Sequence, residues 1–355
     1  MKSRLTEKEK LVLYGLVKYP DLTYGTLAKK IGLKHSTVTA IRLRQRQNDY
    51  YRCLRVPILQ NLGCEMLVVI YTNFNPVIPL EERVVTTGRT IEVFEELFYS
   101  IGEQDKGFSL SLARDYASIG KINDIRTQAF GGCGILEDEY PHMVVFPFGI
   151  SRIYRFFDFV PLLRHNFGLD TEKETKVFDY GAKSKKTVIF NETEKNVYYM
   201  LVKHPELSDG NLAMKLGISR HTVSRVRRYF EQEDLLRRIN LPNLKKLGFE
   251  ILTFMHIQFD PRNPPGMERD EAIALMSDET IFMASRMFET VMIFVHSDYD
   301  AYKKDKTRIM QILKENKWVT KDPLIRTYGL NTSIVIKDFK FAPIAKKMVG
   351  STLRI

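Results

Sequence analysis

The sequence predicts an α+β protein made of two tandem copies of one fold, each a winged helix-turn-helix followed by a ferredoxin-like βαββαβ domain. Three observations lead to this prediction. The stretch LAKKIGLKHSTVTAIR at 27–42 returns as LAMKLGISRHTVSRVR at 212–227. Each of these stretches has the pattern of a helix, a glycine turn and a second helix. Each is followed by alternating strand and helix patterns.

The repeat extends well beyond these two stretches. A shift of 185 places residues 6–76 on 191–261 without a gap, and 29 of the 71 aligned positions are identical. The similarity returns between 155–168 and 337–350, now at a shift of 182. Chance would give only a few matches, so we infer a tandem duplication with a net loss of three residues in the second copy.

The first two helices of each copy carry their own boundary signals. Thr6 and Glu9 form a capping-box pattern before the first helix, and Thr23 is a candidate N-cap for the second. Gly32 follows the second helix at the position where a left-handed backbone is needed. Apolar residues at helical spacing predict the buried faces: Leu11, Val12, Leu16, Val17, Leu27, Ala28, Ile31, Val38 and Ile41, with Leu212, Ala213, Leu216, Gly217, Val223 and Val226 in the second copy.

A third helix begins at His35 or Ser36 and completes the helix-turn-helix unit. The basic, β-prone segment YYRCLRVPIL at 50–59 follows it, and RRINLPNL at 237–244 takes the same place in the second copy. We expect these segments to form wing hairpins.

The rest of each copy is expected to fold in the order β-α-β-β-α-β, the ferredoxin-like arrangement. In the first copy the elements are a strand at 64–76, a helix within 80–97, two strands within 98–115, a helix at 116–130 and a strand at 142–150. In the second copy they are a strand at 250–261, a helix at 268–278, strands at 281–289 and 291–298, a helix at 300–317 and a last strand at 333–339.

These patterns predict five segments. They are a winged helix-turn-helix at 1–57, a ferredoxin-like domain at 58–170, a charged linker at 171–189, a second winged helix-turn-helix at 190–242 and a second ferredoxin-like domain at 243–355.

Positive charge is concentrated on the two third helices and the segments that follow them. Residues 29–55 carry +7 and residues 214–240 carry +4, which together equal the +11 of the whole protein. A basic helix that neutralises phosphates explains this distribution better than a helix-turn-helix used only as a scaffold. The sequence therefore predicts double-stranded DNA as the partner.

The third helices are expected to enter the major groove, where their N-terminal residues meet the base edges and the arginines after them hold phosphates. The candidate DNA-binding residues are His35, Ser36, Thr37, Thr39, Arg42, Arg44, Arg52 and Arg55 in the first copy, and Arg220, His221, Thr222, Ser224, Arg225, Arg228, Arg237 and Arg238 in the second. Because the two sets differ, we expect the two helices to prefer different half-sites.

The order of domains resembles the Lrp/AsnC family of feast/famine regulators. The motif Pro-x-x-x-x-Leu-Gly-x-x, found as PILQNLGCE at 57–65 and PNLKKLGFE at 242–250, supports the resemblance. It implies DNA binding by the N-terminal module and dimerisation through the ferredoxin-like sheet, so a duplicated chain would act as a covalent dimer. It also implies a small-molecule effector at the ferredoxin-like domains, although LARDYASIG and VHSDYDAYK stand where the family has a glycine-rich loop.

The resulting prediction is a sequence-specific transcriptional regulator that is not an enzyme, has neither metal nor cofactor, and pairs further as a homodimer. Two alternatives remain. Siroheme decarboxylases resemble the same architecture and occur fused in tandem. An architectural protein would coat DNA with little sequence preference.

Several patterns argue for or against these readings. None of the seven histidines is spaced as HxxxH or HxxH, and GGCG at 131–134 is expected to be a turn. The stripe Phe156, Phe157, Phe159, Leu162 and Leu163 is expected to serve packing or a subunit interface.

Three scattered cysteines without a CxxC motif, and no long apolar run, predict a cytoplasmic protein without a membrane span. The Lys-, Ile- and Tyr-rich composition favours an archaeal source.

Overall fold

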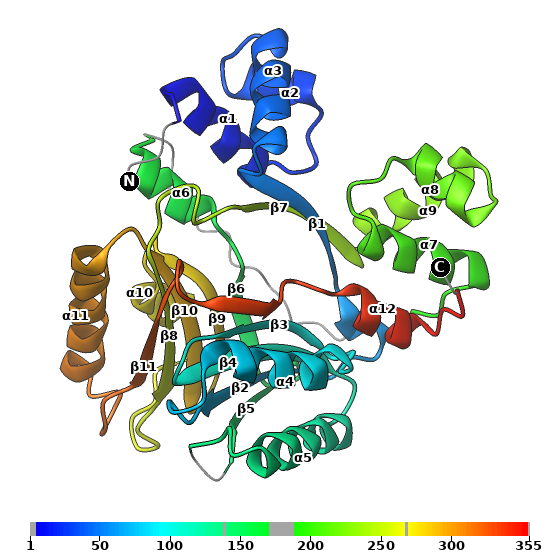
Figure 1. Cartoon of the computed structure of the whole chain (residues 1–355). Helices are drawn as coiled ribbons and strands as arrows, with labels where there is room; N and C mark the ends of the chain where they lie inside the picture. Colours follow the sequence, from blue (N-terminus) through cyan, green and yellow to red (C-terminus); the bar gives the residue numbers. More distant parts are fainter. Residues whose placement is uncertain (1–4, 138–139, 170–187, 267–268, 354–355) are drawn as a thin grey trace. The chain divides into compact units, whose positions relative to one another are not determined.

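The computed structural model describes residues 5–137, 140–169, 188–266 and 269–353 (Figure 1). The predicted linker at 171–189 lies outside the described residues except for its last two positions. By contacts the chain divides into two compact units. One comprises Met1–Leu54, Ser151–Tyr180 and Arg238–Asn331, and the other comprises Arg55–Ile150, Gly181–Arg237 and Thr332–Ile355.

The first helix-turn-helix consists of α1 (Glu7–Lys18), α2 (Tyr24–Lys30) and α3 (His35–Gln47). The predicted capping box is present, since the backbone N–H of Thr6 donates to Glu9 Oε2 at 2.8 Å. The three helices enclose one apolar core, which confirms the predicted inner faces: Val12, Leu16, Leu27, Ala28, Val38 and Ile41. Figure 1 shows the helices gathered into one group at the N-terminal end of the chain.

The second helix-turn-helix repeats this arrangement with α7 (Glu192–Lys203), α8 (Asp209–Leu216) and α9 (Arg220–Gln232). Ser208 and Ser219 cap α8 and α9 by accepting backbone N–H groups, so the unsatisfied donors at both helix starts have partners. Gly217 ends α8 with a φ of 65°, the left-handed conformation that the glycine position predicts.

The first ferredoxin-like sheet has the strand order β12-β3-β4-β2-β5, with antiparallel neighbours throughout. Its elements from the first copy are β2 (Met66–Asn73), α4 (Leu80–Glu92), β3 (Leu97–Gly102), β4 (Lys106–Ala113), α5 (Tyr116–Gly132) and β5 (His142–Pro147). Side chains of α4 and α5 pack against one face of this sheet in a shared apolar cluster. The predicted βαββαβ order is confirmed.

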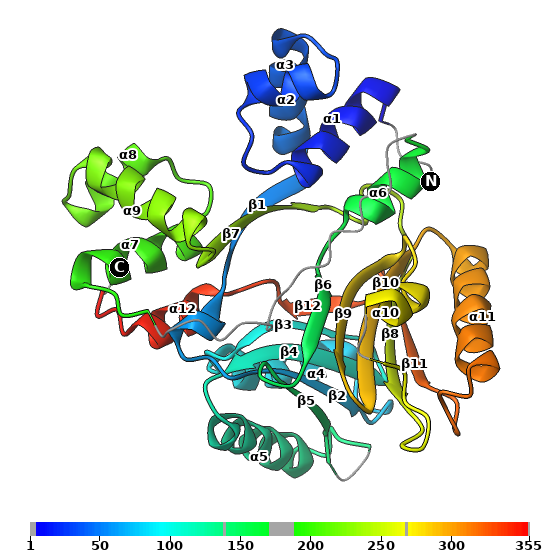
Figure 2. The same cartoon turned by 180° about the vertical axis from the view of Figure 1, so that it is seen from behind.

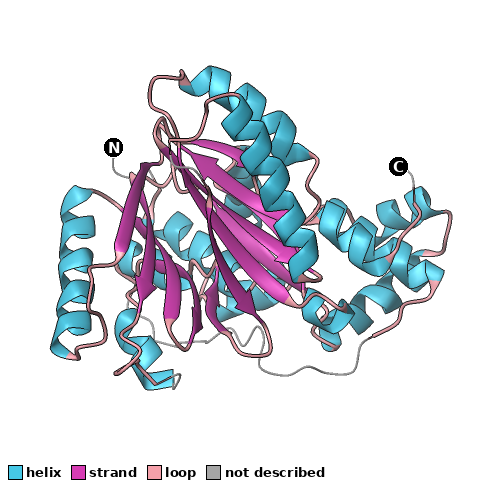
Figure 3. Ribbon diagram, turned by 90° about the horizontal axis from the view of Figure 1, so that it is seen from below, coloured by secondary structure: helices cyan, strands magenta, loops and turns pink. Residues whose placement is uncertain are grey.

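The second sheet has the order β11-β8-β10-β9-β6, also antiparallel. Figure 3 shows the strands of the chain in magenta and the helices in cyan. Its elements from the second copy are β8 (Ile251–Gln258), α10 (Arg269–Leu275), β9 (Thr280–Arg286), β10 (Glu289–His296), α11 (Tyr299–Glu315) and β11 (Leu324–Gly329). The fourth strand is β11, so the prediction that 333–339 forms it is wrong. The segments 324–329 and 333–339 are both β-prone. The first pairs with β8 of its own copy and the second pairs with β3 of the other copy, which the sequence pattern does not specify.

The C-terminal segment of each copy adds an edge strand to the sheet of the other copy. These segments are β6 (Arg152–Phe156) with α6 (Val160–Phe167), and β12 (Ile334–Lys337) with α12 (Ala342–Val349). Strand β6 pairs with β9, and β12 pairs with β3. Each compact unit therefore combines residues from both copies, in contrast to the contiguous domains that the sequence suggests.

The predicted wing hairpins are not formed. Instead β1 (Tyr51–Pro57) and β7 (Leu236–Pro242) pair with each other as a two-stranded sheet. A 3₁₀ turn, η1 (Leu59–Leu62), follows β1 and ends at Gly63 with a φ of 89°. A β-prone segment satisfies its backbone hydrogen bonds with any suitable partner strand, so the sequence pattern alone does not identify that partner.

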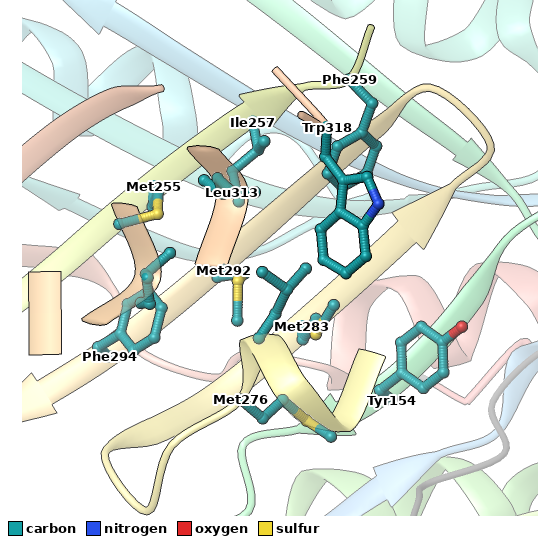
Figure 4. Packing of buried hydrophobic residues seen from close by; sticks show 12 residues of the cluster. Tyr154, Met255, Ile257, Phe259, Met276, Met283, Met292, Phe294, Leu313 and Trp318 are labelled. Atoms are coloured by element: carbon teal, nitrogen blue, oxygen red, sulfur yellow. The ribbon is translucent and has the colours of Figure 1, made fainter. Parts of the chain in front are cut away.

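Helices α10 and α11 cover one face of the second sheet (Figure 2). The cluster between them and the strands is rich in methionine and contains the single tryptophan, Trp318 (Figure 4). The aromatic stripe of the first copy is buried as predicted, and Phe156 and Phe157 pack on Phe282 of β9. No helix in the described part of the chain is long and apolar enough to span a membrane.

Candidate nucleic-acid interface

Helix α9 presents a cationic surface. Arg220, Arg225 and Arg228 are exposed, and none of them forms an ion pair with an acidic residue of the described chain. Arg228 Nε donates only to the carbonyl oxygen of Ser224, at 3.3 Å within the same helix. His221 is exposed next to Arg220. These side chains can therefore reach a phosphate or a base edge without first breaking an internal ion pair.

Helix α3 presents a different surface at the equivalent positions. The shift of 185 places Arg220, Arg225 and Arg228 on His35, Ala40 and Leu43, all of which are exposed. Ser36 and Thr39 are also exposed, and Thr37 is partly buried. The first module thus offers small, polar and apolar side chains where the second offers three guanidinium groups.

One arginine in each module ties the second helix to the third. Arg227 of α9 forms two hydrogen bonds with the carboxylate of Asp209 in α8, at 2.9 and 3.0 Å, and a third with Glu231. The equivalent Arg42 of α3 lies over the ring of Tyr24 in α2, with 4.1 Å from the guanidinium carbon to the ring centroid. Arg42 is half-buried in this internal contact, and its contact with DNA stays a prediction.

Two more predicted arginines are engaged in ion pairs. Arg44 contacts Glu9 of α1 at 2.5 Å, and Arg237 contacts Asp234 at 2.5 Å. Burial acts to raise the pKa of Glu9, but hydrogen bonds from Thr6 and the charge of Arg44 outweigh it and lower the pKa. The charge of Arg44 is partly neutralised by Glu9, but 59% of the Arg44 side chain is exposed, so a phosphate can still reach it.

The remaining predicted phosphate ligands divide into exposed and buried residues. Arg52 is exposed, whereas Arg55 is only 7% exposed and cannot reach a ligand outside the protein. Arg238 is half-buried and its Nε donates to the Cys53 sulfur at 3.1 Å. The prediction that Arg55 holds a phosphate is therefore corrected, because the last three residues of β1 are all buried.

The hydroxyl groups at the start of α9 serve the helix itself. Thr222 Oγ1 lies 2.9 Å from the capping Ser219 Oγ, and the Thr222 backbone N–H donates to the same oxygen. Ser224 is partly buried. Among the predicted residues of this helix, the long cationic side chains are thus better placed than the hydroxyls to contact a ligand.

Two buried histidine clusters were missed by the search for short-range histidine motifs. His256 Nε2 lies 3.1 Å from Glu289 Oε2, and Arg286 also contacts that carboxylate. His296 Nε2 lies 3.3 Å from Asp305 Oδ2. Within the described residues, no group of three His, Cys, Asp or Glu side chains could hold a metal ion. His256 and Glu289 meet through the register of β8 and β10, and His296 of β10 meets Asp305 of α11 in the packing of helix on sheet. A search for HxxxH or HxxH spacing detects neither pair.

Comparisons with solved structures find one likeness over nearly the whole chain and others over about 40% of it. The siroheme decarboxylase NirDL is similar over 97% of this chain and 99% of its own, with a TM-score of 0.50 and 11% identity. AsnC from E. coli covers 40% of this chain with a TM-score of 0.31 and 16% identity, matching 91% of its own length. An AsnC-family regulator from Pyrococcus furiosus covers 41%, with a TM-score of 0.31 and 17% identity, matching 89% of its length. No family model and no curated protein matches the chain.

The full-length comparison confirms the predicted fold, which NirDL shares over nearly the whole chain, and corrects one prediction. The chain was expected not to be an enzyme, yet a solved structure that matches nearly all of it is that of an enzyme. At 11% identity this likeness establishes a shared fold.

Proposed function

We propose that the protein is a sequence-specific DNA-binding transcriptional regulator that reads two unlike half-sites through α3 and α9. The observation that supports this most directly is the set of three exposed arginines on α9 without acidic partners, Arg220, Arg225 and Arg228. A helix that follows a tight turn and presents arginines from its first turn onward fits the recognition helix of a helix-turn-helix protein.

The two modules contribute unequally. Guanidinium groups bind guanine and phosphate, so α9 supplies most of the electrostatic affinity and favours guanine-containing sequences. At the same positions α3 offers Ala40, Leu43 and His35, which suit contacts with thymine methyl groups and hydrogen bonds to base edges. One polypeptide that carries both modules gains affinity through effective concentration when both half-sites are present.

The test is selection of genomic DNA fragments by the purified full chain at a fixed salt concentration near physiological. We expect a motif of two different half-sites, separated by one helical turn of DNA or an integral number of turns. Retention of DNA without a motif would instead support a protein that coats DNA. A failure to retain DNA would refute the proposal.

A second candidate function is a decarboxylase that acts on a carboxylated tetrapyrrole. It is supported by the likeness to the siroheme decarboxylase NirDL, which extends over the whole chain rather than over one copy. A solved NirDL structure is in complex with an iron-uroporphyrin III analogue, so that class of compound is the natural probe.

The enzyme candidate is tested by absorbance titration with iron uroporphyrin III, followed by mass spectrometry of the pigment after incubation. Saturable spectral change and loss of carbon dioxide from the pigment would support it, and an unchanged spectrum would refute it. The variant Arg225→Ala/Arg228→Ala serves as a control, because it should weaken DNA binding and leave pigment binding unchanged.

A further inference from the structure

The two ferredoxin-like domains have very different side chains at equivalent positions of their cores. Sheet register establishes the equivalence. Ser109 of β4 lies opposite Ile70 of β2, and Met292 of β10 lies opposite Met255 of β8. Because Ile70 and Met255 are related by the repeat shift of 185, Ser109 and Met292 occupy the same place in the two copies.

The same reasoning extends to three neighbours. Ser100 lies opposite Ser109 as Met283 lies opposite Met292, and Ser111 corresponds to Phe294. Helices α5 and α11 are both 17 residues long and begin after the capping residues Asp115 and Asp298, so Arg126 corresponds to Ile309. The first domain thus has Ser100, Ser109, Ser111 and Arg126 where the second has Met283, Met292, Phe294 and Ile309. Figure 4 shows Met283, Met292 and Phe294 in the apolar core of the second domain.

Arg126 is buried without a counter-ion. Only 3% of the residue is exposed, and no carboxylate of the described chain forms an ion pair with it. Its Nη1 donates to Ser109 Oγ at 3.0 Å, and its Nε has no hydrogen-bond acceptor. The guanidinium carbon lies 5.7 Å from the centroid of the Phe130 ring. Burial lowers the pKa of Arg126 to about 10, so the side chain is still a cation at neutral pH.

A second buried arginine lies in the same layer between helices and sheet. Arg83 of α4 is 1% exposed, donates to the carbonyl oxygen of Glu103 and lies 4.0 Å from the Phe74 ring centroid. Phe74 and Phe130 contact each other edge to face at 6.3 Å. Each of the two guanidinium groups therefore lies near one ring of the same aromatic pair.

An uncompensated buried cation destabilises a folded protein, and the fold does not require one here. The second domain shows this directly, because Ile309 fills the Arg126 position in an apolar core. The three serines also occupy less volume than two methionines and a phenylalanine. The Ser109 hydroxyl accepts from Arg126 and donates to the carbonyl oxygen of Ile70 at 3.4 Å, so it holds the guanidinium group in place. A fixed positive charge and reduced side-chain volume favour the binding of a small anion.

We propose that the first ferredoxin-like domain binds a small carboxylate at Arg126, between α5 and β4. The planar guanidinium group holds the two carboxylate oxygens, the Ser109 hydroxyl supports it, and Arg83 adds positive charge nearby. The second domain lacks the site because its equivalent residues are apolar. This inference is independent of DNA binding and of pigment decarboxylation.

The test is calorimetric titration and thermal unfolding of the full chain as sodium chloride is replaced, mole for mole, by sodium acetate. We expect saturable heat and a rise in Tm of about 5 °C at an acetate concentration of 100 times Kd. The variant Ser109→Met/Arg126→Ile copies the residues of the second domain, so it should fold and bind acetate at least tenfold more weakly. Arg89→Gln removes an exposed charge from α4 of the same domain and should bind like the wild type.

Absence of saturable acetate binding in the wild-type protein would overturn the proposal, as would equal binding by the double variant. The variant Arg126→Lys keeps the charge but lacks the planar fork, and it covers the case in which the double variant does not fold. Its acetate affinity should fall at least tenfold, and an unchanged affinity would also overturn the proposal.

Discussion

At the scale of single residues, the exposure of each arginine separates ligand-contacting groups from structural ones. The two modules contain several arginines with similar sequence surroundings, yet Arg228 is exposed and Arg55 is buried. A buried guanidinium cannot contact an external phosphate, whereas an exposed one can do so at little cost in desolvation. We therefore expect the effects of substitution to follow exposure rather than position along the chain.

The variant Arg228→Ala should weaken DNA binding by about 1–2 kcal/mol and lower the slope of log Kd against log salt by about 1. Fluorescence anisotropy over a series of salt concentrations measures both quantities. Leu43→Ala is the matched control at the equivalent position of α3, and its salt slope should equal that of the wild type. Equal slopes for all three proteins would show that Arg228 does not contact a phosphate.

The environment of Asp305 leads us to expect a free energy of unfolding that decreases in acid. Burial raises its pKa, but hydrogen bonds from His296 and Ser277 and the charge of Arg308 outweigh burial and lower it. The ionised carboxylate therefore stabilises the fold above its ordinary pKa, and this stabilisation is lost as the pH falls through the lowered value.

We expect Asp305→Asn to reduce the free energy of unfolding by about 3 kcal/mol at pH 7, because it removes the charge that pairs with the buried His296 and with Arg308. The difference from the wild type should shrink as the pH falls below about 4. Urea unfolding at several pH values measures this. A difference that is independent of pH would mean that the carboxylate charge is not involved.

At the scale of helices and strands, the second and third helices are joined by a different kind of contact in each module. Arg227 joins α9 to α8 through the Asp209 carboxylate, and Arg42 joins α3 to α2 through the Tyr24 ring. Burial raises the pKa of Asp209, and the hydrogen bond and charge of Arg227 outweigh it and lower the pKa. Both contacts set the angle at which the third helix is presented.

A double-mutant cycle with Arg227→Ala and Asp209→Ala should give a coupling energy of about 1–2 kcal/mol in the free energy of unfolding. The ion pair is bidentate and three-quarters or more buried, so it should exceed a fully exposed surface pair. The cycle of Arg228→Ala with Asp209→Ala is the control and should give a value near zero. Equal coupling in both cycles would contradict the proposed role of Arg227.

At the scale of the whole molecule, the C-terminal segments contribute to folding outside their own copy. Strand β12 completes the edge beside β3, and Lys337 donates to the carbonyl oxygens of Ile91 and Phe94 at the end of α4. Phe341 stacks on Phe98 of β3 at 4.7 Å. Stability of the first sheet therefore depends on residues more than 200 positions away in the sequence.

Removal of residues 332–355 should expose the β3 edge and increase amide hydrogen exchange in β3 and α4. Strand edges left unpaired also promote aggregation, so light scattering should rise. The point variant Phe341→Ala keeps the strand and should affect exchange less. Unchanged exchange of β3 in the truncated protein would show that the edge pairing does not stabilise the sheet.

The sequence alone determined the duplication, the helix-turn-helix modules and the βαββαβ order, because these depend on local periodicity, capping residues and glycine turns. Thr6, Glu9 and Gly217 act locally and could be recognised without a partner. The tertiary structure alone decided which strand edges meet, so β11 rather than 333–339 is the fourth strand and β1 pairs with β7. It also decided that Arg55 is buried, that Arg42 packs on Tyr24 and that Arg126 lies buried beside Ser109. The physical reason is that strand pairing and burial depend on contacts between distant residues, which a local pattern permits but does not specify.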